Sequence, residues 1–160
     1  MTMQTDVVSK FVTATGAVTT DRYRLKALWV SPTVATNPNP AFVNTATSLT
    51  GTYSQTTTTI TVTCTGHGLV VGQRVALAFT TGSAASGGFA VATAADANTF
   101  TVTTPLTGTN SGNVTIYTQV SIELGVSALT QGALLVPSEG VLFTNGIYYV
   151  GIVEMTVFYG

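Results

Sequence analysis

The segment Thr56–Thr65 reads TTTTITVTCT and contains the pattern that decides the fold class. Threonine alternates there with Ile60, Val62 and Cys64, so one side of an extended chain is apolar and the other is polar. A period of two residues is typical of a half-buried β-strand. β-Branched residues also favour strands over helices. The segment therefore predicts a strand whose Ile60, Val62 and Cys64 side chains face a core.

The same signal recurs along the chain between turn sequences. Windows that could form an amphipathic helix are interrupted by Gly, Pro, Asn or runs of β-branched residues. We therefore expect an all-β protein. The expected strands are 10–15, 23–31, 56–65, 74–80, 89–94, 99–104, 113–118, 121–126, 133–137, 141–143, 147–150 and 155–159. Turns are expected around Gly16 and at 66–68, 82–88, 96–98, 107–112, 138–140 and 144–146, where Asn145-Gly146 is a hairpin signal.

Two styles of sequence indicate two nested domains. A threonine-rich composition begins near residue 49 and ends near residue 118. Neither of the two flanking segments is long enough by itself to bury a good hydrophobic core. We therefore predict an outer β-sandwich or jelly-roll-like domain built from residues 1–34 and 119–160. Residues 35–48, with two Asn-Pro steps, are expected to be a linker. Residues 49–118 are expected to form an inserted small β-barrel or sandwich module whose two ends lie close together.

Charged side chains are scarce in the whole chain. Only 7% of the residues are charged, the net charge is −1, and no Asp, Glu, Lys or Arg occurs from Ala27 to Gln73. A typical soluble domain has about 25% charged residues, and a surface this poor in charge promotes association. The few cations argue against nucleic-acid binding, and no apolar run reaches the ~18 residues of a membrane span. We expect a homo-oligomer or a lattice-bound protein, with a trimer as the first symmetric form to test.

The side chains that could carry chemistry are few and scattered. Cys64 and His67 cannot complete a structural zinc site, which needs four ligands, and Cys64 lies in the apolar phase of its strand. The six acidic residues fall in turns, in or beside strands, or in the N-terminal arm. The loop Gly82–Gly88 lacks the lysine and the following helix of a phosphate-binding loop. We predict no catalytic, metal-binding or cofactor-binding residues, no cofactor, and therefore no enzyme activity.

Two groups of side chains are candidates for contact with a partner protein. Arg22, Arg24 and Lys26 would share one face of a strand, which is either solvated or forms salt bridges to a neighbouring subunit. The aromatic residues near the C-terminus would serve the core, an interface or stacking on sugars. The complete set of interface candidates is Arg22, Arg24, Lys26, Tyr148, Tyr149, Phe158 and Tyr159.

Two motifs in residues 49–118 point to a family: the turn Gly66-His-Gly-Leu69 and the run Ala97-Asn-Thr-Phe-Thr-Val102. They resemble a small β module of tailed-bacteriophage virion proteins. Similar modules are labelled after a half-domain of ubiquitin-activating enzymes, but this one supplies no nucleotide site, so the label implies no ubiquitin chemistry. The flanks, with Arg24–Val30 and Met155–Tyr159, are similar to compact β proteins of phage structural regions.

The resemblance implies a component of the virion. The first expectation is a capsid cement or decoration protein that clamps neighbouring subunits of the major capsid protein. The alternatives are a tail, adaptor or fibre-associated virion protein, or a module that binds carbohydrate on the host surface. Residues 1–10 lack the pattern of a secretory signal, so we expect synthesis and assembly in the host cytoplasm.

Overall fold

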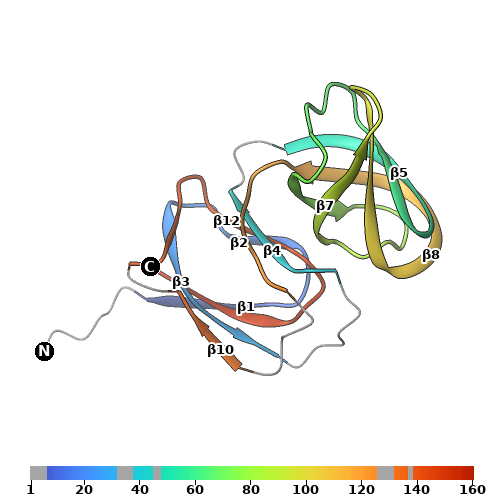
Figure 1. Cartoon of the computed structure of the whole chain (residues 1–160). Helices are drawn as coiled ribbons and strands as arrows, with labels where there is room; N and C mark the ends of the chain where they lie inside the picture. Colours follow the sequence, from blue (N-terminus) through green and yellow to red (C-terminus); the bar gives the residue numbers. More distant parts are fainter. Residues whose placement is uncertain (1–6, 32–37, 45–47, 126–131, 137–138) are drawn as a thin grey trace, which may run out of the picture.

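The computed structural model describes residues 7–31, 38–44, 48–125, 132–136 and 139–160. Throughout these ranges the regular backbone consists of β-strands in three antiparallel sheets (Figure 1). The predicted all-β fold is therefore confirmed. Parts of the predicted outer domain, linker and turns lie outside the described residues, at 1–6, 32–37, 45–47, 126–131 and 137–138.

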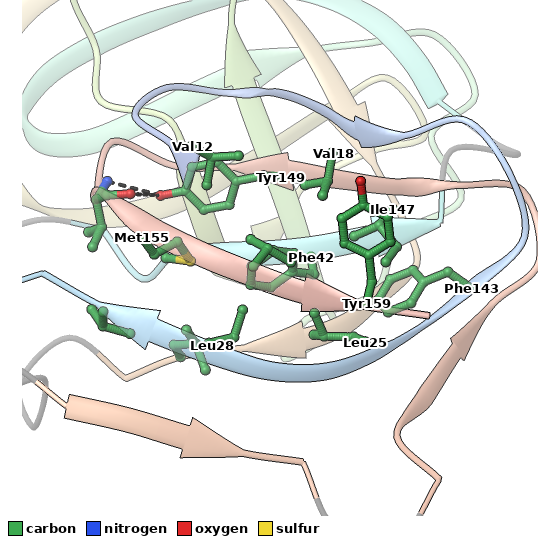
Figure 2. Close-up of a cluster of buried hydrophobic side chains, with 14 residues drawn as sticks. Val12, Val18, Leu25, Leu28, Phe42, Phe143, Ile147, Tyr149, Met155 and Tyr159 are labelled. Atoms are coloured by element: carbon green, nitrogen blue, oxygen red, sulfur yellow. Dashed lines mark hydrogen bonds between the residues drawn. The ribbon is translucent and has the colours of Figure 1, made fainter. Parts of the chain in front are cut away.

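Two of the sheets form a β-sandwich from the two ends of the chain. Sheet A has the order β1 (Val8–Val12), β13 (Met155–Tyr159), β3 (Tyr23–Val30) and β10 (Gly132–Leu135), and β11 (Val141–Phe143) also pairs with β3. Sheet B has the order β2 (Gly16–Thr19), β12 (Ile147–Val150), β4 (Ala41–Asn44) and β9 (Val120–Glu123). The inward side chains of both sheets share one core, and Figure 2 shows Phe42, Tyr149, Leu28 and Met155 within it.

A β-bulge in β3 sets which side chains enter this core. Lys26 has no partner in the register, because Phe158 pairs with Ala27 and Tyr159 pairs with Leu25. One extra residue changes the phase of a strand relative to its neighbour. Leu25 and Leu28 consequently both face the core, although they lie three residues apart.

Residues 48–117 form the third sheet, sheet C, which closes into a barrel-like body. Its strands are β5 (Ser48–Thr63), β8 (Thr99–Tyr117), β6 (Arg74–Phe79) and β7 (Gly87–Ala94). β8 pairs with β5 along most of its length, with β7 near its start and with β6 near its end. The body has its own core, which includes Ile60, Val62 and Cys64 as the alternation predicts.

The long β5–β8 ribbon bends so that this barrel can close. The register shifts between Thr57 and Thr59, and Pro105 and Gly108 lie in the facing part of β8. Near the start of β5, a Cβ on Gly51 would collide with the carbonyl oxygen of Thr63. Glycine therefore lets the beginning of β5 cross its own end at close range.

The chain leaves the sandwich and returns to it at one place. Val43 of β4 pairs with Val120 of β9, and Ser48 of β5 pairs with Tyr117 of β8. The two ends of the barrel therefore lie side by side. The division of the chain into independently folding domains stays a prediction.

Four local predictions are wrong. Residues 107–112 are not a turn but continue β8, because residues 108–112 pair with β5. The predicted turn at Gly16 is the start of β2, and the predicted linker contains β4, which pairs on both sides. The turn at 144–146 does not close a hairpin, because it joins β11 of sheet A to β12 of sheet B.

Candidate interaction surfaces

The outer faces of the two sandwich sheets differ in what covers them. The barrel packs on the outer face of sheet B over β4 and β12 (Figure 1). The outer face of sheet A has no such cover among the described residues, and several of its large side chains are exposed. The buried cluster between sheet B and the barrel consists of Ala41, Val43, Ala76, Ala78, Tyr117 and Val150.

Strand register defines two rows of side chains on the outer face of sheet A. Directly paired residues of antiparallel strands point to the same side of the sheet. The first row, across β1, β13, β3 and β10, is Phe11, Thr156, Trp29 and Ala133. The second row is Ser9, Phe158, Ala27 and Leu135. None of these eight side chains is charged.

The largest side chains of this face are exposed to solvent. The exposed fraction is 57% for Phe11, 46% for Trp29 and 74% for Leu135, while Phe158 is half-buried. Contiguous apolar area of this kind on a protein surface marks an interaction site. Aromatic residues without charged neighbours are also typical of the centre of protein interfaces. The face is therefore the candidate docking surface of the chain.

Charged residues of opposite sign stand at the two ends of this face. Arg24 precedes the inward-facing Leu25 and thus lies on the outer side, where its guanidinium is 3.4 Å from the carboxylate of Glu139. Glu154 precedes the inward-facing Met155 at the opposite end and is exposed. Leu25 and Leu28 both face inward, so Lys26 between them also lies on the outer side, next to Arg24. Arg24, Lys26 and Glu139 together leave one positive charge at this end, Glu154 gives a negative charge at the other, and the two uncharged rows lie between them.

The four aromatic interface candidates fall in three different places. Tyr149 is fully buried, and Tyr159 is buried where it packs on the ring of Tyr23, so neither is available to a partner. Strand alternation points both rings into the sandwich core, which corrects their assignment as interface residues. Tyr148 packs on Tyr117 at the boundary with the barrel, with ring centroids 5.2 Å apart. Phe158 alone of the four lies on the outer face of sheet A.

The three cationic candidates lie along or just before β3. Arg22 precedes the strand and is exposed, Arg24 lies near Glu139, and Lys26 occupies the bulge. Arg24 also donates a hydrogen bond of 3.2 Å to the carbonyl oxygen of Gly140. A role for these cations in partner contact stays a prediction.

A polar contact fixes the barrel to the sandwich at β9. The carboxylate of Glu123, whose side chain is only 13% exposed, accepts hydrogen bonds from Nε of Arg74 at 2.7 Å and from Nδ2 of Asn39 at 2.6 Å. The backbone of Gly88 lies against the same carboxylate, since a Cβ there would touch it. The side chain therefore links three segments that lie far apart in the sequence.

Cys64 and His67 have local structural roles in the barrel. Nδ1 of His67 accepts from the amide of Leu69 at 3.0 Å, so Nε2 carries the proton and donates to the carbonyl oxygen of Asp96, also at 3.0 Å. Cys64 is buried, and burial raises the pKa of its thiol. Among the described residues, no group of three or more His, Cys, Asp and Glu side chains is placed to hold a metal ion.

Sequence reasoning missed Phe11, Trp29 and Leu135 as surface residues. The signal for Trp29 was present, because Leu28, Trp29 and Val30 are apolar in both phases of one strand. An apolar residue in the outward phase of a half-buried strand indicates an apolar patch on the surface of the sheet. The sandwich core covers one face of β3, and Trp29 stands exposed on the other.

Comparisons with known proteins leave the family open. No protein-family model matches the chain, and no curated protein matches it. Among solved structures, it is similar to the endosialidase of phage phi92, with 23% sequence identity and a TM-score of 0.35. The match covers 81% of this chain and 20% of that one, so this chain spans about a fifth of its length. A likeness this distant assigns neither fold nor activity. No helix in the described part of the chain is long and apolar enough to cross a membrane.

Proposed function

We propose that the chain is a non-enzymatic structural protein of a tailed-phage virion, and that it acts as a capsid cement protein. It would bind neighbouring subunits of the major capsid protein after synthesis in the host cytoplasm and hold them together. The observation that carries this proposal is the pair of uncharged, partly exposed rows of side chains on the outer face of sheet A. An all-β chain with such a face is suited to protein association, whether the face binds a virion protein directly or a second copy of the chain that binds it.

The mechanism is passive clamping. The interactions available are apolar contact and backbone or hydroxyl hydrogen bonds, because charged side chains are few. Individual contacts of this kind are weak, but many of them around a closed shell add through multivalency. The protein would thus raise the temperature at which the particle breaks without any chemical step.

Two measurements on particles test this function. Quantitative mass spectrometry of purified virions should find the chain in a copy number comparable to that of the major capsid protein. Particles assembled without the chain should release their genome at a lower temperature than complete particles. A copy number of a dozen or fewer, with unchanged particle stability and a loss of adsorption to the host, would contradict the cement function and favour a tail protein.

A further inference from the structure

The uncovered face of sheet A requires a specific occupant. Three of the large exposed hydrophobic side chains among the described residues, Phe11, Trp29 and Leu135, lie on the outer face of sheet A. Val8 and Leu134 belong to the same sheet but pair with inward-facing residues. The equivalent face of sheet B is closed by the barrel through small residues such as Ala41 and Ala76, which leave little space between the two bodies. The outer face of sheet B is therefore packed against the barrel, whereas the outer face of sheet A, on the opposite side of the sandwich, has no such contact among the described residues.

We propose that a second copy of this chain covers the outer face of sheet A, in a face-to-face contact with two-fold symmetry. The proposal rests on the proposed function, because it names one binding partner of a protein whose function is to associate with other proteins. Two β-sheets stacked face to face repeat the arrangement that sheets A and B already adopt inside the chain. Because two equal faces close on each other, this contact gives a dimer and not the trimer expected from composition.

Charge complementarity identifies the occupant as a copy of the same chain. A two-fold axis that runs between the sheets and across their strands places the Arg24 end of one face over the Glu154 end of the other. The end that holds Arg24, Lys26 and Glu139 carries one net positive charge and then meets Glu154 of the other copy, while the uncharged rows meet in the middle. The side chain of Arg24 is 36% exposed beside Glu139, which is itself 80% exposed, so Arg24 can still reach a partner.

The size of the face sets the strength of the contact. Four strands about 4.8 Å apart and five residues at about 3.4 Å each give a projected area of roughly 320 Å². Standard stable interfaces bury about 800 Å² of accessible surface on each partner. The dimer should therefore be weak and in exchange with the monomer, and in a particle it would be held by further contacts.

The geometry of the dimer fits a clamp. Sheet A faces away from the barrel, since the barrel covers the opposite side of the sandwich. The two barrels of the dimer consequently lie at its far ends, where each can contact a different neighbouring subunit. Trp29, which is the only tryptophan of the chain, lies in the middle of the contact and reports on it through its fluorescence.

The first experiment is analytical ultracentrifugation of the purified chain over a wide concentration range, with Trp29 fluorescence recorded in parallel. We expect a reversible monomer–dimer equilibrium and a blue shift of Trp29 emission as the dimer forms. The Phe11→Lys and Leu135→Lys variants should stay monomeric at concentrations where the unchanged chain is dimeric, with unchanged circular dichroism. The matched control is Val71→Lys, which places the same charge on a valine of the barrel that is 65% exposed; it should dimerise normally.

A charge exchange tests the two-fold arrangement. Arg24→Glu and Glu154→Lys should each weaken the dimer several-fold, and the double variant should recover most of the loss. A chain that is monomeric at its highest soluble concentration would overturn the proposal. Equal weakening by Val71→Lys would also overturn it, as would a double variant weaker than either single one. Because no particle is used, a missing dimer would leave the measurements on virions to decide the proposed function separately.

Discussion

At the residue scale, the hydroxyl of Tyr149 is a fully buried polar group of the sandwich core that makes two hydrogen bonds to one residue. It donates to the carbonyl oxygen of Val153 at 2.7 Å and accepts from the amide of the same residue at 2.9 Å, as the dashed lines in Figure 2 mark. Buried backbone groups that lose their partners cost about 1–3 kcal/mol. We expect Tyr149→Phe to lower the free energy of unfolding by about 2 kcal/mol, measured by urea denaturation.

The control for this variant is Tyr23→Phe. The ring of Tyr23 packs on the ring of Tyr159 in the same β-sandwich. The hydroxyl of Tyr23 makes no hydrogen bond within the described residues. Its removal should change stability by less than about 0.5 kcal/mol. Equal losses in the two variants would show that the paired hydrogen bonds to Val153 contribute nothing measurable.

The buried tyrosines also make stability depend on alkaline pH. Burial raises the pKa of Tyr149 and of Tyr117 above the ordinary value of about 10. The folded state then holds these protons more tightly than the unfolded state, so the stabilisation is complete below pH ~10 and is lost as the pH rises further. We expect unfolding free energies, measured in a Cys64→Ala background to remove the thiol, to fall above that pH. The fall should be shallower when Tyr149→Phe is added.

At the scale of the element, the bend of the β5–β8 ribbon contains a strained residue. Thr57 has a φ of 55°, and the buried side-chain amide of Gln55 donates to its carbonyl oxygen at 3.0 Å and to that of Leu106 at 2.8 Å. A β-branched residue is unfavourable at positive φ, whereas asparagine tolerates it. We expect Thr57→Asn to raise the free energy of unfolding by about 0.5–1 kcal/mol.

The comparison for Thr57→Asn is Thr59→Asn in the same strand. Thr59 pairs with Thr103 in regular register, where asparagine is a poorer strand residue than threonine. Thermal unfolding should therefore show opposite signs for the two variants. A loss of stability in both would mean that the conformation at position 57 is not a source of strain.

The same elements show what sequence reasoning reached. Period-two alternation predicted the barrel strand at 56–65 and its inward residues, because the two faces meet chemically different surroundings. It failed at 107–112, where Gly, Asn and Ser read as a turn. There the partner strand β5 supplies backbone hydrogen bonds that local preference cannot anticipate. It also placed Tyr149 and Tyr159 at an interface, because pattern alone does not say which apolar face a second sheet will cover.

At the scale of the whole molecule, the pairing of β4 with β9 explains how a barrel can sit inside a sandwich. Val43 and Val120 are partners across that ladder, so the ends left by removing residues 48–117 already lie side by side. A short Asn-Gly linker there would turn β4 and β9 into an ordinary hairpin. The sandwich core and the barrel core are separate clusters, which predicts that each body can fold without the other.

The last prediction is the outcome of that excision. The shortened sandwich and the isolated segment 48–117 should each give cooperative thermal unfolding and dispersed amide NMR spectra. Both should be less stable than the intact chain, because separation exposes Val43, Val150 and Tyr117 and breaks the bond between Arg74 and Glu123. Changing Val43 and Val150 to threonine should make the shortened sandwich more soluble, since these positions then face water. If either part is unfolded on its own, the two bodies form one cooperative unit and the predicted division into domains is wrong.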